Sequence, residues 1–280
     1  MTLCIFNPEH DLCLANGNPN YMPPASAIRR ARHDAGLMQA LYPGATCCSV
    51  YDPELPAFVA QADTVVAWGW NSVVRQALLR QGCPPALLPS EADLSTILRL
   101  QHRTSILPLQ PDCRAISSIA QLEPLHDGTP LLLKAPLSGA GHGLRWLRGA
   151  CTDKDLEWLH KTLNRQQCVI VEPWRAVDAN LAFLYDGPRF VGYSCFETQA
   201  GVYRRNLMWP DSVIEAHFAH ANLSAMRADI EQWLQRNVWP HYRGPLGVDL
   251  MLCGSRLYVA ELNLRHTMGM VAHAQIPQCP

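Results

Sequence analysis

The sequence predicts a protein that combines a small parallel α/β layer with a larger α+β part. In the first hundred residues, short apolar runs alternate with stretches of helical spacing, which is typical of a parallel sheet covered by helices. From Gly128 onward, strand-like runs follow one another with few helices between them. Hydrophobic residues make up 48% of the 280 residues and charged residues 17%, so the chain has enough apolar material for two or three small domains.

The N-terminal part contains two strand patterns and two helix patterns in alternation. The strands are short apolar runs that end at turn residues, and the helices carry apolar residues three or four positions apart. In chain order, the expected elements are a strand at 3–6, a helix at 26–42, a strand at 64–68 and a helix at 72–80. These elements predict a parallel α/β layer.

A domain boundary is expected after this layer. A helix is predicted over 91–104 with Ser90 as its N-cap, and prolines interrupt the pattern beyond it. We place the boundary near residue 95. The expected domains are therefore 1–95 and 96–280.

The second part mixes hairpins with helices. Strands are expected at 131–134, 144–147, 168–172, 181–185, 189–196, 202–208, 246–252 and 256–262, and helices at 153–164 and 222–237. This pattern favours an α+β arrangement for residues 96–280.

Composition argues against several classes of partner and site. A net charge of −1 gives nucleic acid no general electrostatic attraction. No apolar run approaches the roughly 20 residues that span a bilayer, and the N-terminal segment lacks the pattern of a secretory signal. The eleven cysteines include no C-x-x-C pair, so neither a zinc site nor a disulfide framework is expected. We expect a soluble cytoplasmic protein without a nucleic-acid or membrane partner.

The first segment with chemical content runs from Leu131 to Gly143. A strand ends in Lys134, one of only three lysines, and glycines follow at every second position, Gly139, Gly141 and Gly143. Glycines allow backbone N–H groups to approach a polyphosphate, and a lysine supplies a charge for its oxygens. A plain β-hairpin turn explains the glycines at least as well, and the segment matches neither a Walker A loop nor a dinucleotide-binding fingerprint.

A stronger signal lies near the C-terminus, where two strands are expected to pair as a hairpin. Asp249 lies in the first strand, and the alternation of the second strand places Glu261, Asn263 and Arg265 on one face. Two carboxylates and an amide oxygen that converge form an oxygen site suited to Mg²⁺. Arg265 could hold an anionic substrate or the charge that develops on an acyl phosphate. The alternative is a solvated polar face on an edge hairpin.

Together these segments resemble the ATP-grasp superfamily of carboxylate–amine ligases. The motifs that carry the resemblance are Leu131-Leu-Leu-Lys134-Ala-Pro with its loop 138–143, Val169-Ile-Val-Glu172-Pro-Trp174, Gly247-Val-Asp249, and Glu261-Leu-Asn263-Leu-Arg265. Their order and spacing match those of the family over about residues 95–275. The resemblance implies an ATP-grasp fold in which two α+β subdomains clasp ATP, with a glycine-rich lid region at about 128–171. The small parallel α/β domain would precede it on the substrate side.

The resemblance also implies a nucleotide site. Lys134 would contact the α- and β-phosphates, and the loop glycines would cover the β- and γ-phosphates. The backbone from Glu172 to Trp174 would bind the adenine edge, and Asp178 is a weaker candidate for the ribose. The family's upstream lysine is missing, and Arg103 is the expected replacement. The expected nucleotide-binding residues are Arg103, Lys134, Ser138, Gly139, Gly141, His142, Gly143, Glu172, Trp174 and Asp178.

The same resemblance assigns the metal and the catalytic residues. Asp249, Glu261 and Asn263 would bind one or two Mg²⁺ ions, for which Mn²⁺ could substitute. Arg265 matches an arginine that steadies the acyl phosphate, so Arg265 and Lys134 are the expected catalytic residues. The expected cofactors are ATP and Mg²⁺.

Two further segments are candidate substrate contacts. The polar segment after the first strand lies where open α/β sheets bind ligands, although a plain structural loop is the alternative. A strand-like stretch at 203–206 holds two arginines, one of which could reach a phosphate or a substrate carboxylate. The candidates are Asn7, Glu9, His10 and Asp11 in the first segment and Arg204 and Arg205 in the second.

The expected function is an ATP- and Mg²⁺-dependent ligase that activates a carboxylate as an acyl phosphate and joins it to an amine or another nucleophile. Its partners would be small-molecule or peptide carboxylates and amines, and a homodimer is compatible with the sequence. Two alternatives stay open, a small-molecule kinase of the same fold and a non-catalytic ATP-binding regulator.

Overall fold

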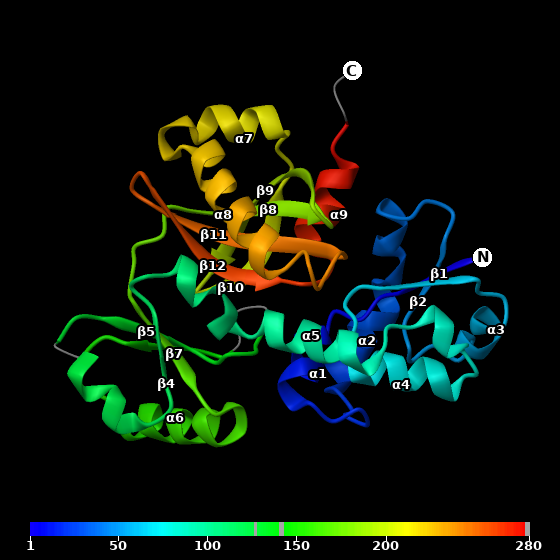
Figure 1. Cartoon of the computed structure of the whole chain (residues 1–280), viewed down its shortest axis with the longest axis horizontal. Coiled ribbons are helices and arrows are strands. Elements are labelled where there is room, and N and C mark those ends of the chain that lie inside the picture. The colour runs from blue at the N-terminus through cyan, green and yellow to red at the C-terminus, as the bar shows by residue number, and fades with distance from the viewer. Residues whose placement is uncertain (126–127, 140–142, 278–280) are drawn as a thin grey trace.

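Three β-sheets organise the part of the chain that the structure describes. The computed structural model describes residues 1–125, 128–139 and 143–277. Figure 1 shows the N-terminal layer in blue and cyan on one side, a green four-stranded sheet next to α6 (Asp153–Gln166), and a five-stranded sheet covered by α8 (Leu223–Asn237). The predicted class, an α/β layer followed by an α+β part, is confirmed.

The N-terminal sheet is wholly parallel, as the alternating pattern predicted, and its order is β2-β1-β3, with β2 a strand that the pattern did not predict. Its elements are β1 (Thr2–Ile5), β2 (Thr46–Cys48), β3 (Thr64–Ala67), α1 (His10–Asn16), α2 (Ala25–His33), α3 (Leu55–Val59) and α4 (Ser72–Arg80), with the 3-10 helices η1 (Ala35–Ala40) and η2 (Pro85–Leu87). Alternate residues of β1 point to opposite faces. Leu3 and Ile5 pack with α3 and α4, whereas Cys4 lies in a second cluster on the other face.

Two local predictions for this layer are wrong. The helix expected over 26–42 ends at His33 and is followed by η1, which contains Gly36, a poor α-helix former. The polar segment after β1 is not a plain loop, because it contains α1. His10, Cys13 and Leu14 of this short helix are buried, so packing against neighbouring elements stabilises it more than its composition does.

The helix α5 (Glu91–Gln101) leads into the second half of the chain. It begins at a capping box between Ser90 and Asp93, so the predicted N-cap is confirmed. It ends three residues earlier than the predicted 104, and the 3-10 helix η3 (Arg103–Leu109) follows. Its apolar face packs into the core of the five-stranded sheet, and residue 95 lies within the helix.

The four-stranded sheet is antiparallel, with the order β4-β7-β5-β6. Its strands are β4 (Arg114–Ile116), β5 (Leu131–Lys134), β6 (Leu144–Leu147) and β7 (Val169–Pro173), and η4 (Ile119–Gln121), η5 (Glu123–Leu125) and α6 accompany them. Leu133, Leu159 and Val171 form part of one core between the sheet and α6. The strands β5 and β6 form the hairpin that carries the glycine-rich loop.

The five-stranded sheet is also antiparallel, in the order β10-β9-β8-β11-β12. Its strands are β8 (Ala179–Asp186), β9 (Arg189–Gln199), β10 (Val202–Leu207), β11 (Pro245–Cys253) and β12 (Arg256–Asn263), and its helices are α7 (Asp211–His217), η6 (Ala219–Ala221), α8 and α9 (Met268–Gln275). One face packs on α7 and α8 in the largest core of the protein. In α9, Met270 packs on this sheet and Val271 reaches the N-terminal core, so this helix joins the two parts.

Within residues 1–125, 128–139 and 143–277, no helix combines the length and the apolar character needed to cross a membrane. The ten cysteines in these ranges are free thiols.

Candidate functional site

The acidic residues predicted to bind metal lie together on β11 and β12. Asp249 pairs directly with Glu261 in the register of the hairpin, and a bulge follows between Asp249 and Leu250. Asn263 Nδ2 donates to Asp249 Oδ2 at 3.1 Å. Leu262, by contrast, faces the large core, as strand alternation predicted.

The electrostatics of this group suit a cation. Burial, assisted by the nearby charge of Glu261, raises the pKa of Asp249 to about 7. Asn263 Oδ1 is buried, and within the described part of the chain it accepts no hydrogen bond. The described residues contain no group of three or more His, Cys, Asp and Glu side chains placed for a metal. The oxygen donors at this position are two carboxylates and the amide oxygen of Asn263. Such a set suits Mg²⁺, which keeps part of its shell for phosphate and water.

Arg103 connects the start of the glycine-rich loop to the acidic group. Its Nη1 donates to Ala135 O at 2.5 Å and to Ser138 Oγ at 2.8 Å. Its Nη2 donates to Ser138 O at 3.3 Å and to Glu261 Oε1 at 2.7 Å. One buried guanidinium therefore touches both the loop of one sheet and the acidic strand of the other.

Lys134 and Glu172 form a second buried ion pair, on the four-stranded sheet. Lys134 Nζ lies 2.8 Å from Glu172 Oε1, because β5 and β7 are neighbours in the sheet. Cys113 Sγ donates to Glu172 Oε2 at 3.7 Å. Trp174 lies just beyond β7, with its backbone N–H donating to Pro130 O at 2.9 Å and 44% of the residue exposed.

Arg265 lies just beyond β12 and pairs with Asp11 of the N-terminal layer. Its Nε donates to Asp11 Oδ1 at 3.2 Å and its Nη2 to Asp11 Oδ2 at 2.8 Å, and its Nη1 donates to His266 O at 3.1 Å. Burial alone would raise the pKa of Asp11, but the charge and hydrogen bonds of Arg265, together with His10 and Arg103, outweigh burial and lower it. Both groups are therefore charged at neutral pH, and the pair joins α1 to the end of β12.

The beginning and the end of the glycine-rich loop are described, while Gly141 and His142 lie outside the described residues. Gly139 packs so closely on the carboxylate of Asp11 that a Cβ atom there would clash with it. Gly143 has a φ of +75°, a left-handed angle that favours glycine. It packs closely against the side chain of Ser138. Asp11, Ser138 and Glu261 thus border one narrow crevice, together with Gln101, Pro136 and Leu137.

The other candidates of the N-terminal segment lie in different surroundings. Asn7 exchanges two hydrogen bonds with the backbone of Gly69, which uses both ends of its amide. Burial lowers the pKa of His10 to about 4, and its Nδ1 lies 3.1 Å from Asn71 Nδ2. Burial raises the pKa of Glu9 to about 7, although Tyr51 donates a hydrogen bond to its Oε1 at 3.0 Å. None of these three is among the residues that border the crevice.

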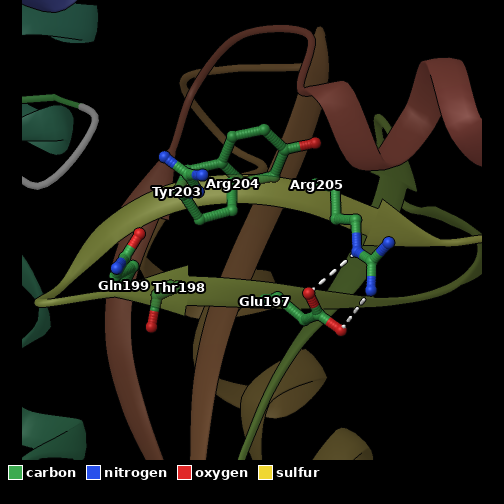
Figure 2. Close-up of a pocket in the computed structure, with 6 residues that line it drawn as sticks. All are labelled: Glu197, Thr198, Gln199, Tyr203, Arg204 and Arg205. Carbon is green, nitrogen blue, oxygen red and sulfur yellow. Dashed lines mark hydrogen bonds and ion pairs between the residues drawn. The ribbon is translucent and has the colours of Figure 1, made fainter.

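Asp178, Arg204 and Arg205 also lie away from the acidic group. Asp178 Oδ2 accepts from Gly254 N at 2.6 Å and so caps the turn between β11 and β12. Arg205 holds Glu197 with two hydrogen bonds on the surface of the β9–β10 hairpin (Figure 2). Arg204 lies at a bulge in β10, at the edge of the sheet opposite β12. Figure 2 shows Arg204 beside Tyr203 in an open pocket of this hairpin.

Two glutamines that the sequence did not single out hold β12 in place. Gln101 Oε1 accepts from Leu264 N at 2.7 Å, and Gln110 Nε2 donates to Val259 O at 2.6 Å. Both residues are buried, Gln101 as the last residue of α5 and Gln110 directly after η3. An isolated glutamine in a helical pattern carries no signal for such a role, so only the fold identifies them.

Comparison with known proteins establishes the fold. No protein-family model and no curated protein matches the sequence. N5-carboxyaminoimidazole synthetase from Staphylococcus aureus, solved with ADP, is 14% identical, with 100% of this chain and 78% of that chain covered and a TM-score of 0.55. The D-cycloserine synthetase DcsG is 13% identical, with 99% and 98% covered and a TM-score of 0.59. D-Alanine–D-alanine ligase from Bacillus anthracis is 12% identical, with 96% and 88% covered and a TM-score of 0.50. The chain has the ATP-grasp fold that its motifs predicted.

Proposed function

We propose that this chain, which has the ATP-grasp fold, is an ATP- and Mg²⁺-dependent ligase that activates a carboxylate as an acyl phosphate and joins it to an amine. One observation carries the proposal. A single guanidinium, that of Arg103, bridges the loop that follows Lys134 and the oxygen-bearing group of Asp249, Glu261 and Asn263. The solved structures that share this fold include a synthetase complexed with ADP and a D-alanine–D-alanine ligase, which supports a nucleotide and a carboxylate substrate.

The residues present fit a divalent cation. Asp249 and Glu261 contribute two carboxylates, and Asn263 Oδ1 is a buried acceptor that lacks a donor among the described residues. We assign the metal to these three side chains. When bound, Mg²⁺ would neutralise phosphate charge and orient the transferred group. The chain's own part is to hold the three oxygens in a fixed arrangement on paired strands, which needs no reorganisation during the reaction.

Two further cations have roles in this proposal, Lys134 on the four-stranded sheet and Arg265 just beyond β12. Lys134 would bind α- and β-phosphate oxygens, and the backbone from Glu172 to Trp174 would bind adenine. Ser138, Gly139 and Gly143, with the loop between them, would cover the β- and γ-phosphates. Arg265 would bind the substrate carboxylate and the acyl phosphate. In the first step the bond between the γ-phosphorus and its bridging oxygen breaks and a carboxylate oxygen takes the phosphoryl group, which asks mainly for position and charge.

In the second step an amine attacks the acyl carbon, phosphate leaves with the bonding electrons of the C–O bond, and the nitrogen loses a proton. Water would hydrolyse the acyl phosphate if it reached it, so the site has to be closed during the reaction. The close packing of Gly139 on Asp11 supports closure between the loop and the N-terminal layer. Asp11 would lie beside the reacting carboxylate through its pairing with Arg265.

A phosphate-release screen tests the proposal. Purified protein, ATP and Mg²⁺ would be incubated with amino acids, small dicarboxylates and amines, and each hit would be examined for its product. An amide, ADP and free phosphate in equal amounts support the ligase, whereas a phosphorylated hydroxyl product identifies a kinase. ATP binding without turnover on any substrate would favour a regulator. Glu261→Ala should lower turnover by about a hundredfold or more, since it removes a charge clamp of the transition state.

A further inference from the structure

Arg103 is held in place by the loop and by the acidic strand together. It lies at the start of η3, where its backbone N–H donates to Pro136 O at 3.1 Å. Its guanidinium binds Ala135 and Ser138 on one side and Glu261 Oε1, at 2.7 Å, on the other. The side chain is buried, and within the described ranges its Nε has no hydrogen-bond partner. A guanidinium with a free buried donor is not fully satisfied in this arrangement.

The acidic group is short of positive charge even with Arg103 present. Glu261 has a cation in contact, whereas Asp249 is in contact only with the amide of Asn263, and the charge of Arg265 acts on it from nearby. Asn263 Oδ1 also lacks a donor among the described residues. Buried carboxylates without paired charge are costly, so the group is built to receive a cation. Arg103 supplies one positive charge to the carboxylate that a metal would need.

We propose that Arg103 stays paired with Glu261 until a phosphate of the nucleotide binds the guanidinium in its place. The divalent cation then binds tightly only together with nucleotide. The inference rests on the proposed function, because it concerns the same metal site. A metal that arrives alone has to break the 2.7 Å ion pair and lie beside a buried guanidinium of the same charge. A phosphate next to the loop removes both obstacles by pairing with Arg103. Arg103 is thus a positioning residue for Glu261 and couples the metal to the nucleotide.

Arginine suits this role better than lysine would. A guanidinium presents five donors in a planar fork, so it can hold Ala135, Ser138 and Glu261 at once. An ammonium is a single point of charge and could not span the loop and the strand together. The hydrogen bonds to Ala135 and Ser138 would also keep Arg103 beside the glycine-rich loop when its guanidinium leaves Glu261.

Binding of Mn²⁺ in the absence of nucleotide tests this inference. Free Mn²⁺ would be measured by electron paramagnetic resonance in titrations of the wild type, Arg103→Gln and Arg103→Lys. Arg103→Gln should bind Mn²⁺ about tenfold more tightly than the wild type, because a charge-assisted hydrogen bond no longer competes for Glu261. Arg103→Lys keeps the charge without the fork and should give an intermediate affinity. Unchanged or weaker binding in Arg103→Gln overturns the inference. Should Arg103→Gln fail to fold, Arg103→Lys decides alone, since an affinity equal to or below that of the wild type is then the contrary result.

Two further variants locate the effect. Arg32→Gln removes an arginine that pairs with Asp52 at 2.9 Å within the N-terminal layer, and it should leave Mn²⁺ affinity unchanged. Adding Glu261→Gln to Arg103→Gln should abolish the gain, and a gain that survives this change would place the bound metal elsewhere and overturn the inference. Because no turnover is measured, a tenfold gain that depends on Glu261 supports the inference even if the phosphate-release screen finds no ligase reaction.

Discussion

Replacing Asp11 by asparagine should destabilise the protein by about 2–3 kcal/mol, because it leaves the buried guanidinium of Arg265 without its paired charge. The substitution keeps the size of the side chain and removes the charge. Two hydrogen bonds to Arg265, at 3.2 and 2.8 Å, lose their charged acceptor. Removing one partner of a buried ion pair commonly costs about 3–5 kcal/mol. The neighbouring charges of Glu261 and Asp249 offset part of this loss, since they also stabilise the charged form of Arg265.

Urea unfolding followed by circular dichroism measures this free energy. Asp186→Asn is a matched control, because Asp186 pairs with Arg189 at 3.1 Å on the surface and its loss should change stability by less than about 1 kcal/mol. If Asp11→Asn is no more destabilised than this control, the Asp11–Arg265 pair does not join the N-terminal layer to β12 as we describe. Binding assays on the folded fraction would show separately whether anions reach Arg265.

Three further predictions concern other parts of the site. Burial raises the pKa of Glu9 from 4.5 to about 7, so the folded protein prefers its protonated form and loses stability as the pH rises between these values. Glu9→Gln should remove this slope and stabilise the protein at pH 8 by up to about 3 kcal/mol in thermal or urea unfolding, and parallel pH curves for the two proteins would contradict the assignment. Lys134→Met should weaken ADP binding in calorimetry by about tenfold or more, whereas Lys161→Met on exposed α6 should not, and equal affinities would remove Lys134 from the phosphate site. Gly139→Ala should push Asp11 off Arg265 and destabilise the protein by about 1–3 kcal/mol in urea, with wild-type stability as the contrary result.

The hairpin of β11 and β12 was predictable because its signal is local. Strand alternation and a short turn fix which residues face each other, and Asp249 lies opposite Glu261 as expected. The glycine-rich hairpin between β5 and β6 was predictable for the same reason. Each depends on residues within about a dozen positions of one another, so a periodic pattern is enough to describe it.

The ion pairs that assemble the site were not predictable in this way. Asp11 and Arg265 are 254 positions apart, and Arg103 and Glu261 are 158 apart. No local pattern reports which of several arginines meets which carboxylate across domains. The sequence suggested Arg103 only as a nucleotide contact. Its ion pair with Glu261 depends on the packing of η3 beside β12, which no local pattern predicts.

Short helices buried on more than one side were also missed. In α9, Met270 faces the five-stranded sheet while Val271 faces the N-terminal layer, so the apolar residues do not gather on one face and the helix shows little amphipathic period. In α1, a helix of seven residues, stability comes from the burial of residues such as Cys13 and Leu14. Tertiary packing, more than the local sequence pattern, determines that both segments are helical.

Crystals grown with ADP and Mn²⁺ provide the most direct measurement of the central claim. Anomalous diffraction locates manganese without reference to the protein coordinates. Our account predicts one or two manganese peaks within about 2.0–2.3 Å of the side-chain oxygens of Asp249, Glu261 and Asn263, with the ADP phosphates beside Lys134. Manganese bound at another site, or ADP phosphates bound away from these residues, would contradict it.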